Sequence, residues 1–226
     1  MDHVVGMRRS GGALLALGGL VFFLAGALHP QGATGTFPET MASMLASPTW
    51  SVAHWLAIAS ALTILWALWL LVDCGWTTAS VVGHVGARLV LVAGLFMAVQ
   101  FAVELAAAPE AAAYAAGALT PMGTLVEAMQ AVGWPAFMLG FVLLIAGVPT
   151  SAPAAVRLAG VVGATAMGLG GVLTEGLHLV AAGPLFIGGN LLALWLVWGG
   201  LAAMRDGQAT VTEARRIEHG EPALTA

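Results

Sequence analysis

The chain has 226 residues, of which 60% are hydrophobic and 8% charged, and its mean hydropathy is +0.95. A soluble domain carries about a quarter charged residues, so 7 basic and 11 acidic residues could not cover a globular surface with solvated groups. The composition therefore predicts an integral membrane protein. The net charge of -4 and the absence of lysine exclude nucleic acid as a partner. The single cysteine, Cys74, excludes an internal disulfide and a thiol-ligated metal cluster.

Long unbroken apolar runs predict helical spans, each of which needs about 20 apolar residues at a rise of 1.5 Å. The segments that satisfy this are 11–29, 50–72, 85–108, 122–147, 155–181 and 184–203. We therefore expect an all-α, polytopic six-helix transmembrane bundle formed by a single domain, residues 1–204. Residues 205–226 are expected to form a short polar tail.

The first apolar run also has features of a secretory signal peptide. Arg8 and Arg9 precede it, and Ala25-Gly26-Ala27 near its end offers a small-residue cleavage pattern. We treat the segment as a retained first span.

The arginines predict the orientation of the chain. With six spans, both termini lie on one side of the membrane, and every arginine falls on that side: Arg8, Arg9, Arg88, Arg157, Arg205, Arg215 and Arg216. Positive residues concentrate on the cytoplasmic side of membrane proteins. Both termini are therefore expected in the cytoplasm, with the protein in a bacterial-type inner membrane and the 30–49 and 109–121 connections outside. Within the first outer connection, Met41, Met44 and Leu45 have helical spacing and predict a short surface helix.

Six ionisable residues form a layer near the outer boundary. All lie within about 12 Å of a span end, counted at 1.5 Å per residue, and they come from five spans: His29, His54, Glu104, Glu127, Glu175 and His178. An ionised group inside a bilayer costs about 2.5–3.5 kcal/mol on insertion scales. Such a layer therefore predicts a polar pocket in the outer half of the bundle, in which the groups pair with one another, with a metal or with water.

The leading hypothesis for this pocket is a metal site. Glu175 and His178 form a Glu-x-x-His pair, expected on one helical face, as in carboxylate-bridged di-metal bundles. His54, Glu104, Glu175 and His178 are then the core ligands, with His29 and Glu127 as additional ones. Imidazole and carboxylate together suit copper, zinc or iron. Haem b is a variant, with His54 and His178 as axial ligands.

An enzymatic alternative uses the same layer for acid–base chemistry. Glu104 or Glu127 would protonate an apolar small molecule, and a neighbouring histidine would remove a proton. Trp50, Trp55 and Trp134 would offer aromatic faces to a cationic intermediate. The activity expected is isomerisation or cyclisation of a lipid or terpenoid.

Non-catalytic interpretations remain open beside these. His29 could cap the last carbonyls of the first span. Glu104 with Gln100, and Glu127 with Gln130, could be hydrogen-bonded groups that hold helices together. The protein would then be an accessory subunit of a membrane complex, a homo-oligomer or a small-solute carrier.

One resemblance is visible in the first third of the chain. Leu28-His29-Pro30 ends the first span, and Trp50-Ser51-Val52-Ala53-His54 opens the second. This arrangement resembles a group of small six-helix membrane proteins from high-GC bacteria, which carry His-Pro after helix 1 and Trp-x-x-x-His on helix 2. The resemblance implies a six-helix fold and no particular activity, and it favours His29, Trp50 and His54 as candidate site residues.

Overall fold

A computed structural model describes residues 2–32, 35–78, 80–118, 120–148 and 151–218, and all regular structure within these ranges is helical. Six helices are long and apolar enough to cross a membrane. They are α1 (Asp2–Leu28), α3 (Trp50–Asp73), α4 (Val81–Ala106), α6 (Pro121–Gly147), α7 (Ala154–Gly171) with its π-helical extension η2 (Val172–Gly176), and α8 (Gly188–Glu218), which follows the 3-10 segment η3 (Val180–Ile187). The all-α class is confirmed, as are six helices long and apolar enough to cross a membrane. Helices of this kind fit a multi-pass membrane protein in contact with the lipid bilayer.

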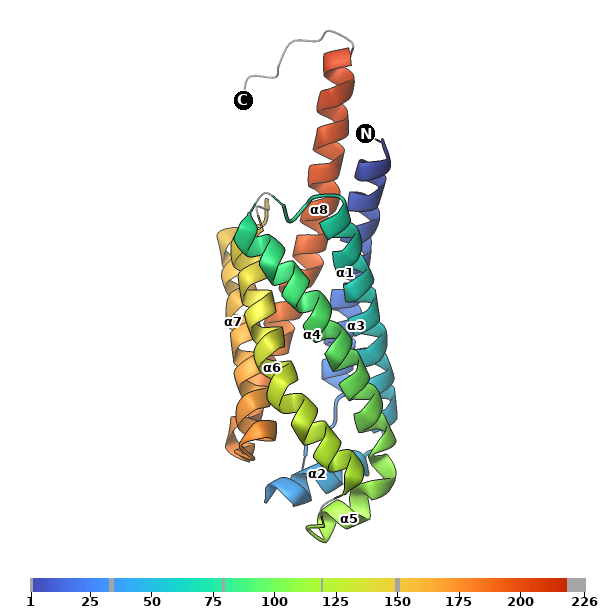
Figure 1. The fold of residues 1–226 in the computed structure, drawn as a ribbon, viewed down its shortest axis with the longest axis vertical. Helices are drawn as coiled ribbons and strands as arrows, with labels where there is room; N and C mark the ends of the chain where they lie inside the picture. Colours follow the sequence, from blue (N-terminus) through green and yellow to red (C-terminus); the bar gives the residue numbers. More distant parts are fainter. Residues whose placement is uncertain (1, 33–34, 79, 119, 149–150, 219–226) are drawn as a thin grey trace.

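The spanning helices form a closed ring in chain order. Each packs against the next one along the chain, and α8 returns to pack against α1. The chain therefore runs up and down around a central axis, with the described parts of both termini at one end of the bundle (Figure 1). We call this the termini end, and the opposite end, which carries α2 and α5, the α2 end.

The α2 end is covered by short helices: α2 (Phe37–Leu45), η1 (Ala108–Glu110) and α5 (Ala111–Ala115). Glu39 accepts hydrogen bonds from the Thr36 N–H and hydroxyl at 2.8 and 2.9 Å, which closes the first turn of α2. These bonds hold the pKa of the Glu39 carboxyl below its usual range. The apolar face of α2 packs on Trp50 and Tyr114. A short helix at this position is thus confirmed, and it covers one end of the bundle.

Glycines allow the closest helix contacts in the ring. Gly86 of α4 lies against the backbone of Leu144 in α6, and Gly83 lies against Gly147 one turn away. A Cβ atom at either position would collide with the backbone of the partner helix. Small residues at such crossings let helices in a bilayer approach until their backbones touch.

The fifth span ends earlier than the sequence predicts, at Gly176 rather than at residue 181. After the π-helical turn, His178 adopts a left-handed conformation with φ 56°, and the N–H of Leu179 returns to the carbonyl of Leu173 at 2.8 Å. At the other extreme, α8 continues to Glu218, so the predicted tail is helical over residues 205–218. Its remainder, 219–226, lies outside the described residues.

The α4–α6 contact generates a prediction about stability. Gly86→Ala forces the Leu144 backbone away and should lower the free energy of unfolding by about 1–3 kcal/mol, the usual cost of overpacking. Unfolding would be followed by circular dichroism during titration of mixed micelles with SDS. Gly26→Ala is the matched control, because nothing lies within 4 Å of a Cβ at that position of α1. Equal stability of the two variants would contradict the proposed close contact.

Candidate functional site

A buried carboxylate lies at the centre of the polar layer. Glu104 of α4 accepts hydrogen bonds from His54 of α3 and Gln130 of α6, and also from Gln100 one turn away on its own helix. The distances are 3.1 Å from His54 Nε2 to Oε2, and 3.1 Å from Gln130 Nε2 and 2.7 Å from Gln100 Nε2 to Oε1. All four side chains are buried. We call His54, Gln100, Glu104 and Gln130 the Glu104 cluster.

The contacts of His54 determine where its protons are. Its Nδ1 lies 2.8 Å from the carbonyl oxygen of Trp50, and a carbonyl can only accept, so Nδ1 carries a proton. The contact between Nε2 and Glu104 Oε2 then needs one proton between the two atoms. This proton belongs either to an imidazolium or to a carboxylic acid. The pair therefore holds one shared proton in a site that the four buried side chains close off from solvent.

A second carboxyl group is held one turn further along α6. Glu175, on the π-helical turn, accepts a hydrogen bond from Trp134 Nε1. Trp134 is one turn beyond Gln130 on α6, so adjacent turns of this helix hold the two carboxyl groups.

Two further predicted ligands lie at the rim of the α2 end. His178 Nε2 is 3.7 Å from Glu127 Oε1, and their side chains are 49% and 39% exposed. The imidazole of His178 stacks on Phe37 of α2, with ring centroids 4.1 Å apart. Glu127 and His178 thus form a partly exposed pair beneath the first turn of α2, separate from the contacts of the Glu104 cluster.

His29 follows the last residue of α1 and lies beside the Glu104 cluster. Its ring centroid is 5.3 Å from that of His54 and 5.8 Å from that of Trp50. Trp50 in turn lies over His54, with centroids 3.8 Å apart, and donates its indole N–H to the backbone carbonyl of Glu104. The resemblance to His-Pro and Trp-x-x-x-His proteins thus involves residues that contact one another.

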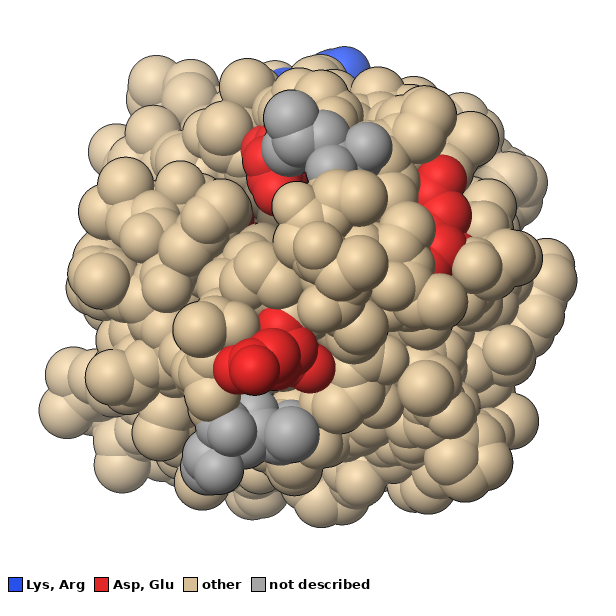
Figure 2. Space-filling model, turned by 90° about the horizontal axis from the view of Figure 1, so that it is seen from below, with Lys and Arg blue, Asp and Glu red and all other residues tan. Residues whose placement is uncertain are grey.

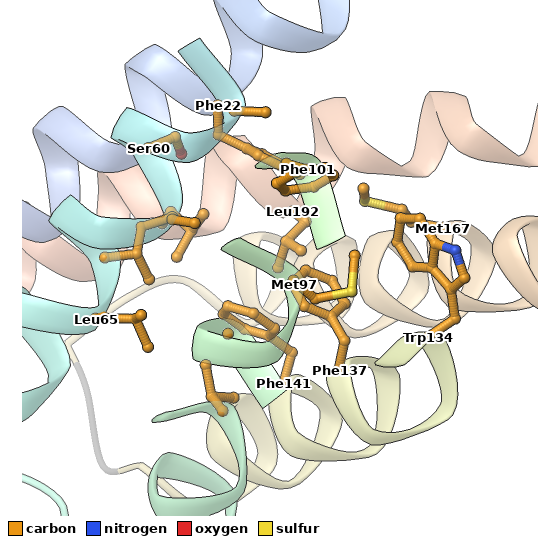
Figure 3. Close-up of a pocket in the computed structure, with 16 residues that line it drawn as sticks. Phe22, Ser60, Leu65, Met97, Phe101, Trp134, Phe137, Phe141, Met167 and Leu192 are labelled. Carbon is orange, nitrogen blue, oxygen red and sulfur yellow. The ribbon is translucent and has the colours of Figure 1, made fainter. Parts of the chain in front are cut away.

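A narrow apolar cavity of about 30 Å³ lies on the axis of the ring. All six spanning helices contribute side chains to its lining. One residue from each helix is, in chain order, Phe22, Ser60, Met97, Phe137, Met167 and Leu192 (Figure 3). The hydroxyl of Ser60 donates to the carbonyl of Gly18 at 2.9 Å. Two further lining residues adjoin the polar groups, because Phe101 meets the His54 ring edge-on at 6.3 Å and Trp134 bonds Glu175. The cavity is therefore apolar, with its polar neighbours on one side.

The six predicted ligands do not meet at one site in the structure. His29, His54 and Glu104 are neighbours, Glu127 pairs with His178, and Glu175 bonds Trp134. Glu175 and His178 do not share a helical face, because the helix ends between them. Within the part of the chain that the structure describes, no three His, Cys, Asp or Glu residues are arranged to hold a metal ion. Metal binding, including haem, stays a prediction.

The tryptophans and amides also differ from expectation. Trp50 and Trp134 are buried beside the polar groups, whereas Trp55 is 62% exposed on the outside of the ring and cannot face a pocket within it. Gln130 was expected to accompany Glu127, but its amide donates to Glu104. Helical spacing identifies neighbours on the same helix, and it cannot show which neighbouring helix a side chain reaches.

The charges on the two ends of the bundle differ in sign. Asp and Glu side chains show at separate places on the α2 end, and Lys or Arg only at its rim (Figure 2). The described arginine side chains belong to helix segments near the termini end, where Arg8 pairs with Asp206 at 3.5 Å.

No protein-family model, no curated protein and no solved structure matches the chain.

The hydrogen bonds of Glu104 predict how substitutions there behave. Glu104→Leu leaves two amides and an imidazole without their acceptor and should lower the free energy of unfolding by about 3–5 kcal/mol. Glu104→Gln should keep most of the stability, because its carbonyl can accept from both amides while its NH₂ donates to a neutral His54.

SDS titration compares the free energies of unfolding of the two variants. Nitrogen-15 NMR of His54 in Glu104→Gln should show that Nδ1 carries the imidazole proton. If Glu104→Leu is as stable as Glu104→Gln, the carboxylate is not the centre of the network.

Proposed function

We propose that the protein is a membrane enzyme that isomerises or cyclises an apolar, lipid-derived substrate by acid–base chemistry. Glu175 donates a proton to the substrate, and Glu104, in its cluster with His54, accepts one. Substrate binding widens the central cavity, which is about 30 Å³ in the structure, and brings the reacting carbons to its polar side. The observation that carries the proposal is the placement of two carboxyl groups against adjacent turns of α6, the buried Glu104 of α4 and the half-buried Glu175 of the π-helical turn, next to an apolar cavity lined by all six spanning helices.

The two carboxyl groups have environments suited to different tasks. Glu104 accepts hydrogen bonds from two amides and shares a proton with His54, an arrangement that suits a carboxylate and hence a base. Glu175 has the Trp134 indole N–H as its donor, and Trp134 itself packs among apolar rings. Two carboxyl groups in contrasting environments are a recurrent arrangement for a general acid and a general base.

The proton balance is that of an isomerisation. Glu175 gives a proton to a carbon–carbon double bond, which leaves a carboxylate on Glu175 and a cation on the substrate. Loss of a proton from a neighbouring carbon to Glu104 forms the new double bond. A proton then returns from the Glu104 cluster to Glu175, so substrate and product have the same formula and no oxidant or reductant is consumed.

Gln100 gives Glu104 the means to hold the additional proton. Its Oε1 is buried without a hydrogen-bond partner in the described chain, while its Nε2 donates to Glu104. Rotation of the amide would exchange the two atoms and offer an acceptor to a protonated Glu104. An amide can therefore serve both protonation states of the carboxyl group.

Glu175 is the proposed acid in place of Glu127, which the sequence suggested. The Glu127 side chain is 39% exposed and pairs with His178 at the rim, whereas Glu175 bonds a residue that lines the cavity. Because exclusion of water from the reacting groups favours catalysis, the carboxyl group nearer the cavity is the better candidate for the acid.

We further propose that both termini lie in the cytoplasm of a bacterial-type cell and that the α2 end faces outward. The support is the concentration of arginine toward the termini end, since basic residues concentrate on the cytoplasmic side. The reaction would then take place in the outer half of the bilayer.

Comparative lipid analysis tests the reaction. Membranes from cells that express the wild-type chain should contain a lipid isomer, equal in mass to a host lipid and different in retention time. Glu175→Gln and Glu104→Gln should each reduce this product by at least about 100-fold, the usual contribution of a general acid or base. Glu110→Gln is the matched control, because Glu110 lies in the connection between α4 and α5.

Each variant would be checked for insertion and for its melting temperature in detergent. Identical lipid profiles for wild type, Glu104→Gln and Glu175→Gln would overturn the proposal. Loss of product in Glu127→Gln alone would return the acid role to that residue.

Metal binding is the second candidate function. The observation that favours it is the juxtaposition of His29, His54 and Glu104, which come from the ends of three spanning helices, with 5.3 Å between the two imidazole centroids. Copper, zinc or iron would suit these donors. His54 would have to exchange its contact with Glu104 or Trp50 for the ion.

Elemental analysis by inductively coupled plasma mass spectrometry tests this second function on protein purified without a metal-affinity tag. A metal site predicts close to one equivalent of a single transition metal, lost in His54→Ala. His84→Ala is the control, because His84 lies near the termini end, where its Nδ1 is 3.3 Å from Thr77 Oγ1. Protein that contains no metal above background would exclude a resident ion.

A further inference from the structure

An open groove of about 290 Å³ lies on the outside of the ring at the termini end. It is formed by the last turn of α6 and the first turns of α7, and its lining residues are Ile145, Ala146, Ala154, Arg157, Leu158 and Val161. We call it the Arg157 groove. Leu158 is 64% exposed, which places the groove on the lipid-facing surface of the bundle. Apart from Arg157, the whole lining is apolar.

Arg157 has hydrogen-bonding capacity that the described protein does not use. Its Nη2 donates to the carbonyl oxygens of Ala146 at 2.9 Å and Ile145 at 3.4 Å, which belong to the last turn of α6 and have no partner within that helix. A guanidinium has five N–H groups in a planar fork. Nε and Nη1 donate to no residue of the described chain, and no described carboxylate forms an ion pair with Arg157.

We propose that the Arg157 groove binds an anionic phospholipid of the surrounding bilayer, with the phosphate on Arg157 and an acyl chain along the apolar wall. A phosphate accepts charge-assisted hydrogen bonds from guanidinium N–H groups such as the unused Nε and Nη1, whereas a zwitterionic lipid offers the same phosphate with a neutralising cation beside it. This inference needs only contact with lipid and does not depend on the proposed enzymatic function.

The position of Arg157 agrees with the headgroup level. It is three residues beyond the start of α7, about 4.5 Å along the axis, so its long side chain reaches the membrane interface. The N-cap of α7 is Pro153, which makes no side-chain cap. The start of α7 therefore has no side-chain cap, and the positive end of its helix dipole lies beside the groove.

Native mass spectrometry of the full chain in mild detergent tests the site with defined probes. Dioleoyl phosphatidylglycerol supplies one anionic phosphate diester, and dioleoyl phosphatidylcholine is the zwitterionic lipid with the same chains. The wild type should retain one phosphatidylglycerol at least tenfold more tightly than phosphatidylcholine. Arg157→Gln should abolish this preference, and Arg157→Lys should restore part of it.

Two further variants separate lipid binding from the capping of α6. Ala154→Phe fills the groove and leaves Arg157 in place, so it should weaken phosphatidylglycerol binding at least tenfold even if Arg157→Gln fails to fold. Arg88→Gln removes an exposed arginine of α4 and should change nothing. Unchanged binding in Ala154→Phe, or equal retention of the two lipids by the wild type, overturns the proposal. Displacement of the lipid by millimolar inorganic phosphate would likewise overturn it in favour of a free-anion site.

Discussion

The carboxylate of Glu104 is buried among helices that a bilayer surrounds, so each of its oxygens must find a donor inside the protein. The donors come from both neighbouring helices as well as from its own, and they fix how α3, α4 and α6 are rotated relative to one another. A shift of one residue along any of these helices turns its side chains by about 100° and would leave a buried acceptor without its donor. A polar contact of this kind specifies one arrangement where apolar packing alone would tolerate several.

Close packing of the backbones makes these hydrogen bonds reachable. Gly133 precedes Trp134 on α6, and a Cβ there would lie 2.9 Å from Met97 Sδ and 3.2 Å from Gln100 Oε1. The absence of a side chain at this position lets α6 approach α4 at the level of the Glu104 cluster. On the axis of the ring, the aromatic and sulfur-containing side chains that meet leave a space of about 30 Å³. The hydroxyl of Ser60 in the cavity wall already donates to the carbonyl of Gly18, so the space is suited to apolar atoms.

Much of this arrangement follows from patterns that the sequence displays. The apolar runs predict the six spans, and the cost of burying charge predicts that the histidines and glutamates meet inside the bundle. The contact of Gln100 with Glu104 follows from helical spacing. The assignment of Gln130 to Glu104 does not, because it depends on how far α6 is rotated and on which glycines let it approach α4. Trp55 shows the same limit, since adjacent positions on a helix point in different directions and only packing decides which one faces lipid.

The end of α7 depends on a deviation that no periodicity reveals. A regular α-helix through residue 181 would place Glu175 and His178 on one face, as the Glu-x-x-His spacing predicts. The wider π-helical turn changes the direction of the side chains that follow, so Glu175 bonds Trp134 while His178 leaves the helix in a left-handed conformation and stacks on Phe37. A π-turn and a left-handed residue are both costly, and such features persist mainly at functional sites. The π-helical turn places Glu175 against Trp134, so the deviation from a regular helix occurs at the residue that we propose as the acid.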